Sequence, residues 1–349
     1  MNLENLKVGI VTYGAVFQRV GGIQVQINET INALRLLGLE VDVIDDRTEQ
    51  LSDFDLIHVF AAAHANYVWV NEAKRQKIPV VFSPVFQPNY SKLQIGKILF
   101  FKWITSFLLS GIAGENIFSS IKYTHKAVKQ ADQVIVQSEK EKEVLRQIFE
   151  LSPKKCTILS NGVSSKFFEA SVSNNKEGYI FIPGAVYKHK NQYTAVKLAC
   201  ELGYDAVLAG EIIDTNYYNQ IMSDFSNVKY AGVLPPQSES LLSFYKNATA
   251  TMLLSHSETF GLVAIESLAA GTPVIMTKNT GLDSQALEHC LLKVDPELPL
   301  RAIEEARTFL MQDFIATELR NSVKSYSWRE IAIKLEHVYK KVVMEMNSA

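Results

Sequence analysis

The sequence predicts an α/β protein made of two doubly wound domains, each built on a parallel sheet. Short β-branched runs alternate with stretches of helical periodicity along the chain, and this alternation is typical of parallel strands joined by crossover helices. A polar stretch at residues 169–178 (EASVSNNKEG) interrupts the pattern, which then restarts, so we interpret this stretch as a linker. The chain has 349 residues, enough for two cores.

The expected strands of the first half are rich in Val, Ile and Phe, as strands buried on both faces are. They lie at residues 7–13, 41–45, 55–60, 79–83 and 133–137, with helices such as 24–37 and 139–149 between them. In the second half, strands are expected at 179–183, 206–209, 228–231, 250–254, 273–277 and 290–294. Because ligands of such sheets bind beyond the carboxyl ends of the strands, a cleft between the two domains is the expected site.

The net charge and the isolated cysteines exclude some classes of function. Lys and Arg number 35 against 37 Asp and Glu, so the net charge of −2 provides no general positive field for nucleic acid. Cys156, Cys200 and Cys290 are isolated, which favours a reducing compartment and argues against a structural zinc site. The first residues do not resemble a signal peptide. We therefore expect a cytoplasmic protein.

Two glycines, Gly21 and Gly22, precede an amphipathic helix. Amides at a helix start bind anions well, so this segment suits a phosphate, although a simple tight turn explains it equally well.

The most informative stretch covers residues 257–275 (SETFGLVAIESLAAGTPVI). A strand ends near Ser255, a loop contains Glu258 and Gly261, and a helix is expected from about Leu262, with Glu266 one turn inside it. In isolation, an acidic residue at such a position is usually a helix cap. Residues 257–275 taken together form a more specific pattern than this single acidic residue.

Glu-x7-Glu enclosing Phe-Gly-Leu, followed by Ala-x-Gly-x-Pro-Val-Ile, closely resembles the retaining glycosyltransferases of family four, which have the GT-B fold of two facing Rossmann-like domains. Further matching segments are residues 131–139 (ADQVIVQSE), 160–163 (SNGV) and 190–191 (KN). Residues 326–328 (YSW) precede a long helix that, in the family, returns to the first domain. The resemblance implies an acceptor-side domain at 1–165 completed by helix 329–349, and a nucleotide-sugar-binding domain at 166–328.

The resemblance also implies roles for individual residues. Glu266 is expected to bind both ribose hydroxyls, and Glu258 to lie beside the donor sugar as a catalytic residue. Lys190 is expected to be catalytic as the cation on the leaving diphosphate. The implied donor-binding positions are Gly21, Gly22, Lys188, Lys190, Gly210, Glu211, Val233, Leu234, Glu258, Thr259, Phe260, Gly261, Leu262 and Glu266.

Two departures from the family pattern stand out. The family places Arg where this chain has Ala185, so one cation for the diphosphate is missing unless Lys188 replaces it. The His that often follows the fourth strand is absent from residues 83–86 (SPVF). We interpret His58, His64, His125 and His256 as packing or capping residues rather than ligands. No metal-ligand cluster is evident, so we expect no metal and no cofactor beyond the nucleotide-sugar donor.

Residues 91–129 combine lysines with a dense aromatic and aliphatic run. This composition fits a helix lying on an anionic membrane, as in a peripheral protein of the inner face, and equally a buried helix with a solvated Lys edge.

Taken together, we expect a retaining, metal-independent transferase that moves a glucose-like hexose from a UDP-sugar to a sugar hydroxyl of a polysaccharide or lipid-linked glycan. A UDP-sugar 2-epimerase of the same architecture and a non-catalytic membrane or scaffold subunit are the alternatives.

Overall fold

The computed structural model describes residues 6–18, 22–61, 66–86, 95–97, 100, 119–169, 176–283, 285–297 and 299–348. The chain divides into two compact units. The first comprises Met1–Asn161 and Trp328–Ala349, and the second Gly162–Ser327. Each unit contains one six-stranded parallel sheet, which confirms the expected fold class of two doubly wound domains.

The sheet of the first unit has the strand order β2-β1-β3-β4-β5-β6. Its strands are β1 Lys7–Val11, β2 Glu40–Val43, β3 Leu56–Phe60, β4 Val80–Ser83, β5 Gln133–Val136 and β6 Cys156–Ile158. The sequence analysis did not predict β6. This strand is three residues long and lies at the edge of the sheet, where Ile158 is exposed, so it lacks the continuous apolar run of a buried strand.

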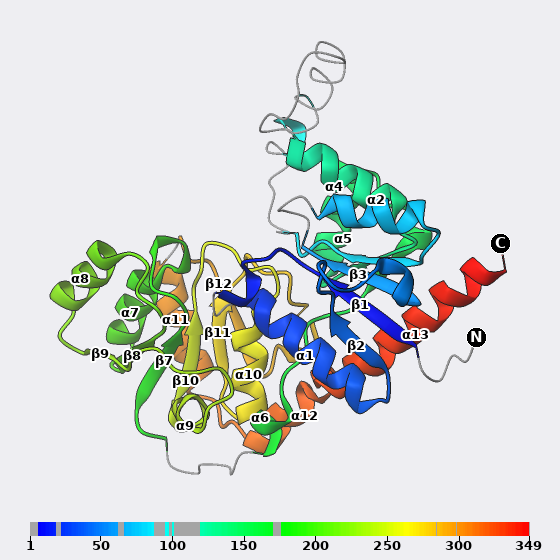
Figure 1. Cartoon of the computed structure of the whole chain (residues 1–349). Coiled ribbons are helices and arrows are strands. Elements are labelled where there is room, and N and C mark those ends of the chain that lie inside the picture. Colours follow the sequence, from blue (N-terminus) through cyan, green and yellow to red (C-terminus); the bar gives the residue numbers. More distant parts are fainter. Residues whose placement is uncertain are drawn as a thin grey trace. The chain divides into compact units, whose positions relative to one another are not determined.

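Helices cover both faces of this sheet. They are α1 Gly22–Leu36, α2 Tyr67–Arg75, α4 Ser119–Gln130, α5 Glu139–Phe149 and α13 Trp328–Asn347, with short 3-10 turns η1 Val16–Gln18, η2 Leu51–Asp53 and η3 Pro153–Lys155. In both views α13, drawn in red, lies against the first unit, and Figure 1 shows it beside α1. Its residues Trp328, Leu335 and Tyr339 are buried in the same core as β1.

The second sheet has the order β12-β11-β10-β7-β8-β9. Its strands are β7 Tyr179–Pro183, β8 Asp205–Ala209, β9 Val228–Tyr230, β10 Ala250–Leu253, β11 Val274–Thr277 and β12 Leu291–Val294. Each coincides with an expected strand to within one residue at either end. All residues of β7, β10 and β11 are buried, as expected for strands covered on both faces.

Two helical layers enclose this second sheet (Figure 1). One layer contains α7 Gln192–Glu201, α8 Thr215–Asp224 and α11 Pro299–Leu310. The other contains α6 Ser165–Glu169, α9 Glu239–Asn247, α10 Leu262–Ala270 and α12 Ala316–Ser322, and the 3-10 turns are η4 Lys188–Lys190, η5 Gln285–Leu287 and η6 Lys324–Tyr326. Among the described residues of the chain, no helix combines the length and apolar character of a transmembrane span.

Candidate active site

Most of the expected site residues lie at one edge of the second sheet. Lys188 and Lys190 follow β7, Gly210 and Glu211 follow β8, and Val233 and Leu234 follow β9. Residues 258–262 follow β10 and lead into α10. Because all strands of this sheet are parallel, their carboxyl ends share one edge, and the structure brings these loops together there.

Backbone hydrogen bonds tie these loops to one another. The Gly184 amide donates to the Ala209 carbonyl at 2.8 Å, and the Gly210 amide donates to the Gly232 carbonyl at 2.9 Å. The Val186 amide donates to the Glu211 carbonyl at 2.7 Å. Gly210 has a φ of +138°, and a Cβ at this position would lie 2.3 Å from the Gly184 oxygen. Only glycine therefore fits where the two loops touch.

An ion pair joins two residues to which the sequence analysis gave separate roles. Nζ of Lys190, in η4, lies 2.7 Å from Oε1 of Glu258, and the two side chains are only 24% and 12% exposed. The buried Ser255 donates its hydroxyl to the same Glu258 oxygen at 2.5 Å. Sequence reasoning missed Ser255, because its contact depends on how the loop folds back after β10.

The loop that carries Glu258 is also fixed by the segment after β11. The Glu258 amide donates to the Asn279 carbonyl at 2.8 Å, and the Gly281 amide donates to the Glu258 carbonyl at 3.2 Å. The Thr280 hydroxyl donates to the Phe260 carbonyl at 3.1 Å. The Glu258 carboxylate therefore lies on a loop that hydrogen bonds to residues 279–281 hold in place.

The start of α10 can bind an anion. Gly261 precedes the helix with a φ of +89°, and a Cβ there would lie 3.0 Å from Cε of Met276. The first amides of a helix have no acceptor within the helix, and the helix dipole adds partial positive charge there. Phe260 is buried, while Thr259 and Leu262 are partly exposed. The diphosphate role expected for residues 260–262 stays a prediction.

Glu266 lies one turn inside α10, as expected, and has a partner that the sequence did not reveal. The Tyr245 hydroxyl, from α9, donates to Oε2 of Glu266 at 2.8 Å. Burial raises the pKa of Glu266 from 4.5 to about 7, and this hydrogen bond opposes the rise.

The segment after β7 shows how the chain accommodates Ala185. The Ala185 carbonyl accepts a hydrogen bond from Nε2 of Gln192 at 2.7 Å, and the nearby Lys188 is exposed. Nε2 of His189 lies 3.1 Å from the Ser257 carbonyl, a contact that also escaped sequence reasoning.

His58 agrees with its interpretation as a packed residue. His58 is 1% exposed, with its ring nitrogens 2.6 Å from the Tyr339 hydroxyl and 2.8 Å from the Ser83 hydroxyl. Burial lowers the pKa of His58 to about 3, so this packed ring stays neutral. Gly22 is the first residue of α1, whereas Gly21 and His64 lie outside the described residues. So does most of segment 91–129, of which residues 95–97, 100 and 119–129 are described.

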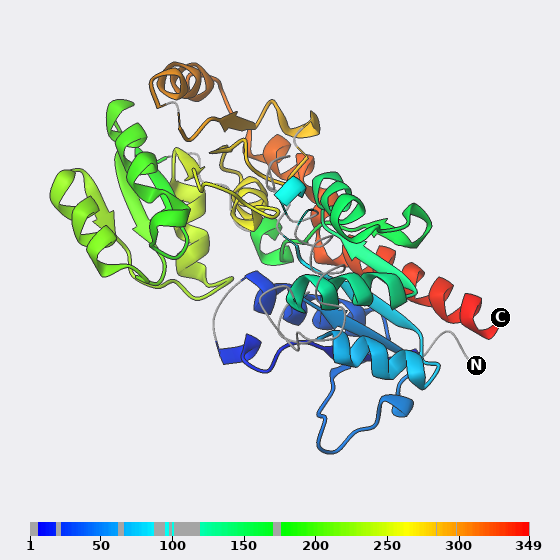
Figure 2. The same ribbon diagram turned by 90° about the horizontal axis from the view of Figure 1, so that it is seen from above.

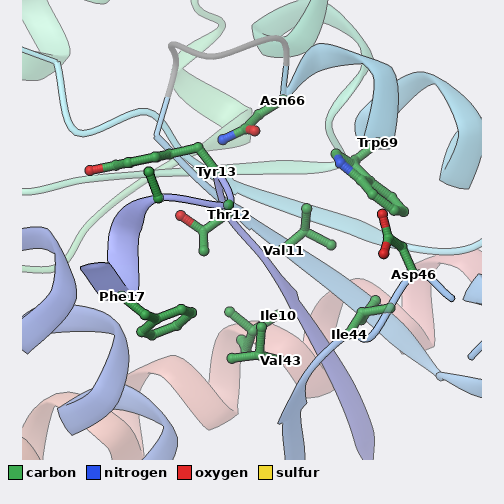
Figure 3. Close-up of a pocket in the computed structure, with 12 residues that line it drawn as sticks. Ile10, Val11, Thr12, Tyr13, Phe17, Val43, Ile44, Asp46, Asn66 and Trp69 are labelled. Carbon is green, nitrogen blue, oxygen red and sulfur yellow. The ribbon is translucent and has the colours of Figure 1, made fainter. Parts of the chain in front are cut away.

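The first unit contains a pocket of about 480 Å³ at the carboxyl ends of β1 and β2 (Figure 3). Aromatic rings of Tyr13, Phe17 and Trp69 line it, together with polar side chains of Asp46 and Asn66. In Figure 3 the Trp69 ring lies close to the Asp46 carboxylate. The sequence analysis identified none of these residues.

In the described part of the chain, no group of three or more His, Cys, Asp or Glu side chains is placed to hold a metal ion.

The second unit matches a known family over almost its whole length. The sequence model of the group 1 glycosyl transferases matches residues 163–326. Over this unit, the chain is similar to the group 1 glycosyl transferases. A curated relative, the D-inositol 3-phosphate glycosyltransferase of Acidothermus cellulolyticus, is 33% identical over 126 residues, which are 35% of this chain and 28% of the relative. Alignments with two further relatives cover 61% and 64% of their lengths, so the chain spans less than two thirds of these curated proteins.

Solved structures show that this chain has the GT-B fold. Sucrose-phosphate synthase from Thermosynechococcus elongatus is similar with a TM-score of 0.70 and 17% identity, over 98% of this chain and 100% of that one. HepE from Anabaena, solved in complex with UDP, is similar with a TM-score of 0.66 and 13% identity, over 96% and 100% of the two chains. At these identities, the likeness concerns the fold.

Proposed function

We propose that this protein is a group 1 glycosyl transferase that moves a hexose from a UDP-sugar to a sugar hydroxyl of a glycan, with retention of configuration and without a metal. The observation that supports this most directly is the Lys190–Glu258 ion pair at the sheet edge that also carries Gly210, Val233 and the start of α10. The structurally similar protein HepE has been solved in one complex with UDP and in another with UDP and glucose. This similarity favours a UDP-sugar as the donor.

In this proposal, the donor is held by groups of the second unit. Backbone of residues 210–211 and 233–234 contacts the base, and the Glu266 carboxylate accepts hydrogen bonds from the ribose hydroxyls. Amides at the start of α10 bind the diphosphate, with Lys190 as its nearby cation.

The chemical step requires stabilisation of the leaving diphosphate. Negative charge grows on this group as the sugar bond breaks, so Lys190 and the fixed amides of α10 stabilise the transition state more than the bound donor. They supply positive charge without a metal. Lys190 and Ser255 both engage Oε1 of Glu258 and draw charge from this carboxylate, which lowers its nucleophilicity. This favours attack by the acceptor hydroxyl on the face from which the diphosphate departs, with the diphosphate oxygen accepting the proton.

For the acceptor, we propose the pocket of the first unit (Figure 3). Aromatic faces pack against the apolar face of a sugar ring, and the Asp46 carboxylate accepts hydrogen bonds from its hydroxyls. Phe17 and Val43 are 37% and 38% exposed, so the rim also offers apolar surface to a lipid-linked glycan. Trp69→Ala should raise the acceptor KM several-fold and leave UDP affinity unchanged, whereas Trp69→Phe should retain most of the affinity.

A product assay tests the proposed reaction. The protein is incubated with UDP-hexoses, with and without glycan acceptors, in the presence of EDTA. Acceptor-dependent sugar transfer is the expected result. Conversion of the donor without an acceptor would instead indicate an epimerase, and absence of both turnover and UDP binding would indicate a non-catalytic subunit.

A further inference from the structure

Tyr245 is the one described side chain that hydrogen-bonds the expected ribose-binding carboxylate. Its hydroxyl donates to Oε2 of Glu266 at 2.8 Å, from a different helix and 21 residues earlier in the chain. The tyrosine is 1% exposed. The Tyr245 phenol is therefore too buried to bind a ligand itself. Its hydroxyl nevertheless contacts Glu266, which is only partly buried.

The phenol has little freedom to move. The Tyr245 carbonyl accepts a hydrogen bond from the Thr272 hydroxyl at 2.7 Å. Its ring packs edge-on against Phe181, with centroids 5.1 Å apart, and against Phe167, with centroids 5.8 Å apart. Backbone and ring are thus both fixed, and the hydroxyl holds one position relative to α10.

We propose that Tyr245 is a positioning residue for donor binding: its hydroxyl holds Oε2 of Glu266, so that the carboxylate is oriented and charged to accept the ribose hydroxyls. This inference rests on the proposed function, because it presupposes that Glu266 binds the ribose. A carboxylate has about four acceptor sites, so one bond from Tyr245 leaves acceptor capacity for both ribose hydroxyls.

Electrostatics explain why such a partner is needed. Burial raises the pKa of Glu266 to about 7, and the hydrogen bond from Tyr245 lowers it from what burial alone would impose. Burial and the nearby Glu266 raise the pKa of Tyr245 well above its ordinary value, so the phenol remains a donor. A protonated Glu266 would have fewer acceptor sites and a competing O–H donor.

Other ionisable groups occur on the elements packed against α10, but in the described part of the chain only Tyr245 shifts the Glu266 carboxyl. These other groups are Lys166 and Glu169 of α6, Glu239 and Lys246 of α9, and Glu318 and Arg320 of α12, while β10 and β11 carry none.

The experiment measures UDP affinity between pH 6 and 9 by calorimetry for the wild type and Tyr245→Phe. Each unit by which the variant raises the pKa of Glu266 weakens binding about tenfold below both pKa values. For a rise of one unit, we therefore expect the loss of affinity to be about tenfold greater near pH 6 than at pH 9, where only the effect of lost orientation remains. The ionisation of UDP itself affects both proteins alike and cancels in their ratio.

Tyr179→Phe is the matched control. Tyr179 belongs to the same core and donates its hydroxyl to the Phe244 carbonyl at 2.9 Å, so its acceptor is a backbone oxygen rather than a carboxylate. Its loss should lower stability without a pH-dependent change in UDP affinity. A ratio of affinities between Tyr245→Phe and wild type that is constant with pH would overturn the inference.

A double variant separates the inference from the proposed function and guards against a merely structural effect. In Glu266→Gln, the added Tyr245→Phe change should cause no pH-dependent loss of UDP affinity, since no carboxyl remains to titrate at position 266. If Glu266→Gln loses affinity but Tyr245→Phe equals wild type at every pH, only the inference fails. If wild-type protein does not bind UDP, or Glu266→Gln binds it normally, the proposed function fails with it.

Discussion

Lys190 and Glu258 lie 68 residues apart in the sequence, yet their side chains meet at 2.7 Å as a partly buried ion pair. The cation expected to face the leaving group and the carboxylate expected beside the donor sugar thus form one unit. Ser255 completes this unit by donating to the same Glu258 oxygen. Each member fixes the orientation of the others before any donor binds.

Lys190→Ala should lower kcat more than it weakens UDP binding, because charge on the leaving group is larger in the transition state. The loss of one preorganised electrostatic donor suggests about 2.7–4 kcal/mol, or roughly 10²–10³ in kcat. Steady-state rates and calorimetric UDP affinities measure the two effects. The exposed Lys188 provides the matched control, and an equal loss of kcat in Lys188→Ala would contradict the special role of Lys190.

Ala185→Arg should tighten UDP binding. The added guanidinium would place a second cation beside the proposed diphosphate site, and a bidentate Arg–phosphate contact suits the diphosphate. Calorimetry with UDP, and with uridine as the control without phosphate, checks this. Tighter binding of uridine as well would point to a change in the base site rather than a phosphate contact.

Gly261→Ala should destabilise the second unit by roughly 1–3 kcal/mol, the usual range for a side chain forced into the left-handed region. Gly261 has a φ of +89°, and a Cβ would also lie 3.0 Å from Met276. Gly178→Ala is a matched control, because Gly178 has a φ of +73° but open space around it. Chemical denaturation should show the greater loss for Gly261→Ala, and equal losses would exclude a contribution from the Met276 contact.

The stability of the first unit should depend on pH because of the buried Glu141 carboxyl. This fully buried carboxyl accepts hydrogen bonds from the amides of Phe86 and Gln137, both at 2.6 Å, yet burial raises its pKa to about 7. The folded state therefore retains a proton between pH 4.5 and 7 that the unfolded state releases, so stability falls as pH rises through this window.

Denaturant unfolding of Glu141→Gln at several pH values tests this linkage. This shift in the pKa of Glu141 corresponds to a change of about 3 kcal/mol in the free energy of unfolding between pH 4.5 and 7. In the variant, the free energy of unfolding should no longer fall by this amount as pH rises. In the second unit, Glu266 makes a contribution of the same sign to the stability of that unit, so Glu266→Gln is the matched comparison. An unchanged slope in Glu141→Gln would mean that the two amide hydrogen bonds keep this carboxyl ionised.

The strands of both sheets could be predicted well because strands that are buried on both faces consist of continuous runs of apolar residues. It overextended β1 to residue 13, whereas the strand ends at Val11 and Tyr13 turns to line the pocket. The edge strand β6 carries no such run and escaped prediction.

Within the site, the motif predicted where Glu258 and Glu266 lie, because both positions are fixed locally around the start of α10. Their partners could not be predicted. Tyr245 belongs to another helix and Lys190 to another loop, and only the packing of the sheet brings them to the carboxylates. The pocket residues Asp46 and Trp69 likewise come from separate segments with no shared motif.

The central claim, retaining sugar transfer without a metal, is tested most directly by the anomeric configuration of the product. The protein is incubated with a UDP-hexose and a glycan acceptor in EDTA, and the coupling constant of the new anomeric proton is measured by NMR. We predict that the product keeps the donor's α configuration. A β-configured product, or transfer that appears only when a divalent cation is restored, would contradict the proposal.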